Sequence, residues 1–162
     1  MTSGPTYTPI ATTTVGTATP SVTFSSVPGT YTDLVVVVNG TTAASVGLAL
    51  RFNGDTSSNY SNTYLGGTGS SAISGRSTST TIGRFGNINT SNTTGVANIQ
   101  NYSNTTTYKT TLGRSSSTDY AITYVNLWRS TAAITSVTVI SDDLATNFAV
   151  GTTLSLYGIA SA

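Results

Sequence analysis

The chain of 162 residues is long enough for one domain with a buried core. It has no cysteine, histidine or glutamate, and charged residues make up 7% of it, against about 25% in an ordinary soluble domain. Disulfides, thiolate metal sites and the usual catalytic bases are therefore excluded, and a net charge of +1 predicts no basic surface for nucleic acid.

Threonine and serine together exceed a third of the residues, which is typical of a disordered chain or of a β-protein with a hydroxyl-rich surface. An apolar content of 37% with clear alternation favours the β-protein. Soluble β-proteins usually protect their sheet edges with charge, above all lysine, and this chain has one lysine. We therefore expect partner subunits to cover many of its edges and faces.

All four prolines lie in the first 28 residues, at positions 5, 9, 20 and 28. Proline cannot donate to a β-ladder, so residues 1–20 are predicted to be an extended N-terminal arm or an edge strand, on the chain's own sheet or on a neighbour. Within this arm, Tyr7, Pro9 and Ile10 are candidate interface residues.

Alternating apolar residues then predict half-buried strands, because successive side chains of a strand point to opposite faces. The run from Leu34 to Val38 is continuously apolar and predicts a strand covered on both faces. Glycine, asparagine and proline between the runs predict turns, and no helical pattern is present. The clearest strands fall in residues 21–27, 33–39, 46–52, 107–113, 120–128, 134–140 and 152–159.

These elements predict an all-β fold, an antiparallel β-sandwich of about ten strands, as a single domain over residues 1–162. The longest apolar run is far shorter than a membrane span requires. Residues 66–81 are rich in glycine, serine and threonine and are predicted to be a functional or mobile loop.

The strand at residues 120–128 has apolar residues on both faces, which predicts a central position in the sheet. We expect self-association near this segment, with Tyr120, Tyr124 and Trp128 as candidate interface residues. An alternative for the aromatic residues is a platform for sugars, with asparagine and aspartate fixing the sugar hydroxyls. The simpler interpretation is that most of them are core or interface residues.

Asp142 and Asp143 form the only adjacent pair of acids. They could contribute to a calcium site or to acid–base chemistry, but the surrounding "SDDLATN" lacks the alternating acids of a calcium loop. Aspartates between strands commonly cap turns through their own backbone, so we favour a corner capped by Asp142. No catalytic, metal or cofactor site is predicted, and no enzymatic activity is expected.

Four blocks of the sequence carry a resemblance: "YTPIATTTVGTATPSVTFSSVPGTYTDLVVVVNG", "LRFNGDTSSNYSNTYLGGTGSSA", "NLWRSTAAITSVTVIS" and "NFAVGTTLSLYGI". Together, and in this order, they resemble a widespread group of tailed-bacteriophage virion proteins. The resemblance runs from Tyr7 to Ile159 and is weak over residues 70–100.

The resemblance implies a β-sandwich of jelly-roll type and a structural place on the surface of the phage particle. It implies either a capsid decoration (cement) protein, often a trimer bound over the major capsid protein, or a component of a tail fibre or spike. The first has the major capsid protein and its own copies as partners, and the second would bind host surface glycans. Neither nucleic acid nor membrane is expected as a partner, and the resemblance transfers no catalytic or ligand residue.

Overall fold

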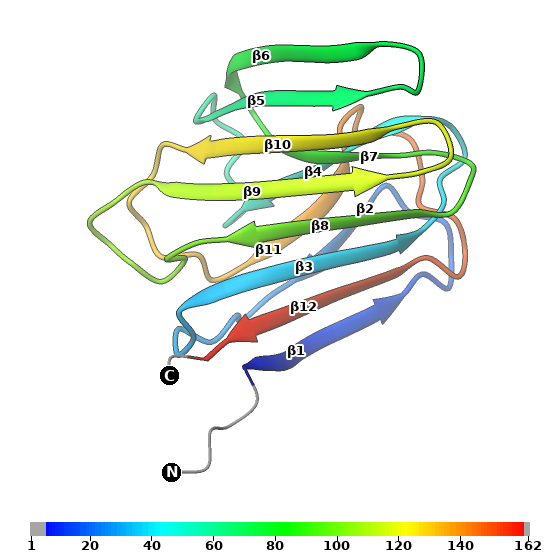
Figure 1. The fold of residues 1–162 in the computed structure, drawn as a ribbon. Coiled ribbons are helices and arrows are strands. Elements are labelled where there is room, and N and C mark those ends of the chain that lie inside the picture. The colour runs from blue at the N-terminus through cyan, green and yellow to red at the C-terminus, as the bar shows by residue number, and fades with distance from the viewer. Residues whose placement is uncertain (1–5, 161–162) are drawn as a thin grey trace.

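The computed structural model describes residues 6–160, and all regular structure in this part of the chain is β-strand. Figure 1 shows two stacked sheets, with the larger one in front and the smaller one behind. The twelve strands are β1 (Tyr7–Thr14), β2 (Ser21–Phe24), β3 (Asp33–Gly40), β4 (Val46–Phe52), β5 (Tyr60–Gly67), β6 (Ala72–Thr80), β7 (Gly83–Ile88), β8 (Thr93–Ile99), β9 (Lys109–Ser116), β10 (Ala121–Trp128), β11 (Val137–Ser141) and β12 (Thr153–Ile159).

The large sheet has eight strands in the order β1-β12-β3-β8-β9-β10-β5-β6, and the small sheet has four in the order β2-β11-β4-β7. All neighbouring strands are antiparallel. The predicted antiparallel β-sandwich is therefore confirmed, with twelve strands where the sequence pattern suggested about ten. No helix in residues 6–160 is long and apolar enough to cross a membrane.

The predicted N-terminal arm is partly an edge strand of the chain's own sheet. Tyr7 to Thr14 pair with β12, and a bulge between Pro9 and Ala11 interrupts the ladder where proline cannot donate. Residues 1–5 of the arm lie outside the described residues. Of the two alternatives for this segment, the structure has the edge strand.

Residues 66–81 are not a long loop, which corrects the prediction from their composition. They contain the end of β5, a turn at residues 68–71 and β6, and the two strands form a hairpin at the end of the large sheet. The backbone N–H of Thr68 donates to the carbonyl of Ser71 and closes the turn. Threonine is well suited to this exposed edge, because β-branched side chains favour the extended backbone of a strand.

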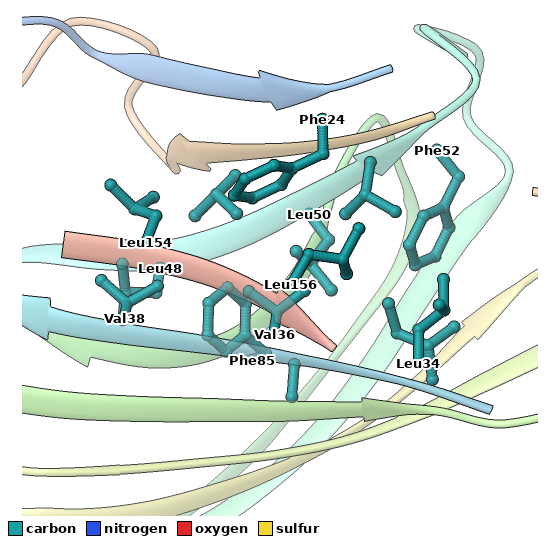
Figure 2. Packing of buried hydrophobic residues seen from close by; sticks show 14 of the residues in the cluster. Phe24, Leu34, Val36, Val38, Leu48, Leu50, Phe52, Phe85, Leu154 and Leu156 are labelled. Carbon is teal, nitrogen blue, oxygen red and sulfur yellow. The ribbon is translucent and has the colours of Figure 1, made fainter. Parts of the chain in front are cut away.

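The core lies between the two sheets, and β3 and β4 contribute to it with alternating residues. Figure 2 shows Leu34, Val36 and Val38 of β3 facing Leu48 and Leu50 of β4. All five are at most 1% exposed. Burial at about 25 cal/mol per Å² of apolar surface makes this layer the main source of stability.

The expectation that the strand at residues 33–39 is covered on both faces holds only in part. Val35, on the side of β3 turned away from the core, is 5% exposed, but Val37 on the same side is only partly buried. That side of the strand contacts neighbouring side chains of its own sheet and no second layer. β3 is a central strand with one face on the core.

Candidate functional site

The adjacent acids Asp142 and Asp143 have different structural partners. Asp142 accepts a hydrogen bond of 2.9 Å from the backbone N–H of Gly47 and lies 3.1 Å from Arg84 Nε in an ion pair. This carboxylate therefore ties the end of β11 to β4 and β7.

Asp143 caps the turn that follows β11. Its Oδ1 accepts from the backbone N–H groups of Ala145 and Thr146, and its Oδ2 bonds the Thr146 hydroxyl. These hydrogen bonds from Thr146 and Ala145 hold the pKa of Asp143 well below its usual range. The turn-capping prediction is thus correct for this corner, but the capping residue is Asp143 rather than Asp142.

A shallow depression of about 300 Å³ beside the pair is lined by Arg84, Asn87 and both acids. All four carboxylate oxygens of the pair already contact protein groups. No group of three or more acidic or metal-binding side chains gathers anywhere in residues 6–160. The acid pair therefore has the properties of a structural corner.

The outer face of the large sheet, the side turned away from the small sheet, is the more informative surface. We define it by two cross-strand rows that run over all eight strands, each residue being the register partner of the next. The first row is Arg76, Thr63, Val125, Leu112, Asn98, Val35, Tyr157 and Pro9. The second row is Ser74, Leu65, Thr123, Arg114, Val96, Val37, Ser155 and Thr12.

Large apolar side chains collect on this outer face without a covering layer. Leu65 is 63% exposed, Val125 is 50% exposed and Leu112 is 44% exposed. Val125 and Leu112 are register partners on β10 and β9, so their side chains lie next to each other. Together with Val37 and Val96, which are partly buried, they make an apolar stripe across the middle of the sheet.

Two depressions lie on the same outer face, on either side of this stripe. The first, of about 440 Å³, is lined by Leu65, Val96, Thr123 and Arg114. The second, of about 360 Å³, is lined by Thr63, Val125, Leu127 and Arg76. Each depression therefore combines apolar groups, hydroxyls and one guanidinium group, and neither is lined by an aromatic ring.

The candidate interface residues of β1 are divided between the two sides of the strand. Tyr7 and Pro9 are exposed on the outer face, and the Tyr7 ring lies edge-on to Tyr157 with centroids 6.4 Å apart. Ile10, at the bulge, is partly buried and packs against the core. Tyr7 and Pro9 are therefore available to a partner, and Ile10 mostly is not.

The candidates at residues 120–128 lie inside the molecule. Tyr124 and Trp128 are 1% and 3% exposed. Trp128 stacks on Tyr60, with centroids 6.3 Å apart, and Tyr124 packs on Tyr64 at 5.2 Å. Tyr120, just before β10, is partly buried. The prediction of Tyr124 and Trp128 as interface residues is corrected, because β10 turns these rings toward the small sheet, where they are buried.

The residues that β10 does expose are Val125 and its outward neighbours, which were not chosen from the sequence. The apolar residues on both faces of this strand did indicate that one face would present apolar side chains outward if only the other face were covered. The sequence correctly predicts an interior strand there, but it does not tell which of the two faces of that strand the small sheet covers.

Lys109, the only lysine, is fully buried at the start of β9. Its Nζ donates to the carbonyls of Thr107 and Thr131, at 2.8 and 3.3 Å. Burial lowers its pKa. This lysine does not protect an edge, so the sheet edges have even less charge than the composition suggests.

No protein-family model matches the chain, and neither a curated protein nor a solved structure shows significant similarity to it.

Proposed function

We propose that this chain is a non-enzymatic structural protein of a bacteriophage particle, and that it acts as a capsid decoration protein bound to the major capsid protein on the surface of the head. The observation that carries the proposal is the uncovered outer face, where Leu65, Leu112 and Val125 are exposed side by side with hydroxyl groups. Large contiguous patches of exposed apolar surface mark interaction sites, and we infer that this face is one.

The composition of the outer face supports assembly with other proteins. Burying a half-exposed leucine or valine stabilises a contact by roughly 1 kcal/mol, half the value for full burial. Threonine and serine around the apolar stripe lose less side-chain entropy at an interface than lysine or glutamate would. A broad face built this way suits a subunit that binds by many small contributions.

The strand order supports the same class of protein. Without the hairpins β5–β6 and β9–β10, the sheets reduce to β1-β12-β3-β8 and β2-β11-β4-β7. Each of these strands then crosses to the other sheet, except that β7 follows β4 within the small sheet. We infer a jelly roll extended by two hairpins. Jelly rolls are common in viral capsid and lectin domains.

The carboxylates support a role without catalysis. Each of the five aspartates accepts a hydrogen bond from a group of its own chain. Hydrogen bonds of this kind hold turns and loops together and favour a structural role over acid–base catalysis. Self-association as a trimer is also proposed, and it rests on the resemblance to phage virion proteins.

Image reconstruction of an intact phage particle that carries this chain tests the proposal. We expect density for the sandwich on the outside of the head, with the large sheet turned toward the capsid. Purified protein should also bind heads that lack it. Density at the tail, together with no binding to heads, would contradict the head assignment.

A tail appendage that binds host carbohydrate is the second candidate, favoured by the hydroxyl groups in the two depressions. Sugar sites usually include an aromatic ring as a stacking surface, and neither depression has one. A glycan array with the isolated protein separates the candidates. Strong binding that free sugar competes away would favour the appendage.

A further inference from the structure

We infer that the outer face binds a protein surface that is apolar in the middle and carries two carboxylates, one for Arg114 and one for Arg76. The inference rests on the proposed function in that the partner is a protein of the particle, and it adds the chemistry by which that partner is recognised. Three observations support it: the positions of the two arginines, the absence of partners for their guanidinium groups in residues 6–160, and the hydrogen bonds that already occupy the aspartates of the chain.

Both arginines lie beside the apolar stripe on the outer face. Arg114 sits between Thr123 and Val96 in its cross-strand row, and Arg76 is the register partner of Thr63 at the β6 edge. Strands β6, β5, β10 and β9 are consecutive in the sheet, so the two Cα positions are three strand spacings apart, about 14 Å. An offset of two residues along the strands increases this to about 16 Å.

Neither guanidinium group has a partner within the described part of the chain. The one ion pair there joins Arg84 to Asp142, and no side-chain hydrogen bond in residues 6–160 involves Arg76 or Arg114. A guanidinium group presents five N–H donors in a plane and matches a carboxylate with two parallel bonds. Each depression is therefore lined by apolar groups, by hydroxyl groups and by one arginine whose guanidinium group is available to bind a carboxylate.

A second copy of the chain does not supply the matching acids. Asp33, the only acid at a register position on the outer face, accepts a hydrogen bond from the backbone N–H of Asn101. The other four aspartates are bonded in turns and loops or to Arg84. The outer face is positive and apolar, so its complement is acidic and apolar and belongs to a different chain.

An acidic glycan is the less suitable occupant. The residues between the two arginines along the sheet include Val125, Leu112 and Leu65, which offer hydrophobic contact and no hydrogen bonds to sugar hydroxyls. Protein interfaces, by contrast, combine an apolar centre with arginine and polar groups at the rim.

The test uses the full chain and its R76Q, R114Q and R51Q variants. R51Q is the matched control, because this variant also removes one positive charge, but from β4 on the outside of the small sheet. The probes are immobilised 12-residue peptides that contain leucine and two aspartates four or six positions apart. In extended peptides these spacings span about 13 and 20 Å, on either side of the separation of the arginines. Matched peptides carry asparagine or lysine in place of aspartate.

We expect the wild-type chain to bind the aspartate peptides and to bind the asparagine and lysine peptides much more weakly. R76Q and R114Q should each weaken binding about tenfold, and R51Q should not change it. Binding should fall as salt rises from 50 to 500 mM. Equal binding to asparagine peptides, or an equal loss in R51Q, would overturn the inference. Tighter, arginine-dependent binding to polygalacturonate than to the peptides would overturn the choice of a protein partner.

Binding to phage heads separates this inference from the proposed function. If R76Q and R114Q occupy heads as fully as the wild-type chain does, the decoration role stands and the two-carboxylate partner is wrong. If the wild-type chain binds the acidic peptides and does not bind heads, the decoration role is wrong and the chemistry of the outer face stands.

Discussion

The indole N–H of Trp128 donates a hydrogen bond of 2.7 Å to Oδ2 of Asp55. Trp128 belongs to β10 in the large sheet, and Asp55 lies in the loop between β4 and β5, so this bond fixes the loop to the core. Asp55 also accepts from the Asn59 side chain at 2.9 Å and from the Ser57 backbone at 2.8 Å. One carboxylate therefore organises the connection from the small sheet to the large one.

Replacing Asp55 with alanine should lower the free energy of unfolding by about 1–3 kcal/mol, because the buried Trp128 N–H loses its acceptor. Urea denaturation followed by tryptophan fluorescence measures it. Asp119→Ala is the control, since Asp119 is exposed and accepts one bond, of 3.3 Å, from a side chain. A loss in D119A as large as in D55A would show that the Trp128 bond has no special role.

Acid should destabilise the protein through Asp55. Partial burial raises the pKa of this carboxyl, but hydrogen bonds from Asn59, Trp128 and Ser57 outweigh it and lower the pKa to about 2. A depressed carboxyl pKa contributes stability that is present above the unfolded value near 3.9 and is lost as the pH falls toward 2.

Thermal unfolding between pH 6 and 2 should therefore show a Tm that falls steeply below about pH 4. Asp55→Asn should reduce this slope without removing it, because the pKa of Asp143 is also lowered by its turn hydrogen bonds. An unchanged slope in D55N would contradict the assignment.

Tyr60 should make the protein sensitive to alkali. Burial raises its pKa to about 12, and its hydroxyl accepts a 2.9 Å hydrogen bond from the Phe52 backbone. The unfolded chain releases the phenol proton near pH 10, so this stability is present below pH 10 and is lost between about pH 10 and 12.

Tyr60→Phe should cost about 1–3 kcal/mol at pH 7, because it leaves the Phe52 N–H without an acceptor, and it should flatten the alkaline loss. Denaturation at pH 7 and pH 11 measures both. The control Tyr108→Phe removes a hydroxyl from an exposed ring and should change stability by less than about 0.5 kcal/mol.

Gly113 should not tolerate a side chain. It lies in β9 directly against Phe85 of β7, and an added Cβ would lie 2.5 Å from Phe85 Cβ and overlap the Phe85 backbone. Gly113→Ala should therefore destabilise the fold by about 1–3 kcal/mol through overpacking. Gly29→Ala, which meets no atom within 4 Å, should have little effect in the same denaturation experiment.

The sequence predicts well the elements whose side chains alternate clearly. The run from Val46 to Phe52 becomes β4 and turns its alternate residues Val46, Leu48, Leu50 and Phe52 into the core, because a period of two leaves one choice of buried face. The hairpin within residues 66–81 could not be predicted this way, because most side chains of β6 are small and polar on both faces and give no apolar period.

The candidate site depended on contacts between distant segments. Both faces of β10 are apolar, so Trp128 and Val125 cannot be assigned to inside and outside until the small sheet is placed against one face. The partner of Asp142 likewise comes from another strand, since Arg84 is on β7. Local patterns predicted the strands, and packing between the sheets decided which residues remain exposed.

Changes to the outer face should affect binding to a partner without affecting the stability of the fold. In the double variant Leu112→Thr/Val125→Thr, both positions keep a residue that suits a strand, and both side chains are at least 44% exposed. We expect the free energy of unfolding to change by less than about 1 kcal/mol, while binding of a hydrophobic dye falls and head occupancy decreases.

Val150→Thr is the matched control for this variant, because Val150 is 66% exposed but lies in the turn before β12, outside the outer face. It should alter neither dye binding nor occupancy. If V150T reduced occupancy as strongly as the double variant, exposed apolar groups would act without regard to position. If the double variant unfolded the protein, Leu112 and Val125 would be needed for the fold itself, and their exposure would no longer support a binding surface. Stable protein with reduced occupancy in the double variant alone would show that this apolar pair is maintained for contact with a partner.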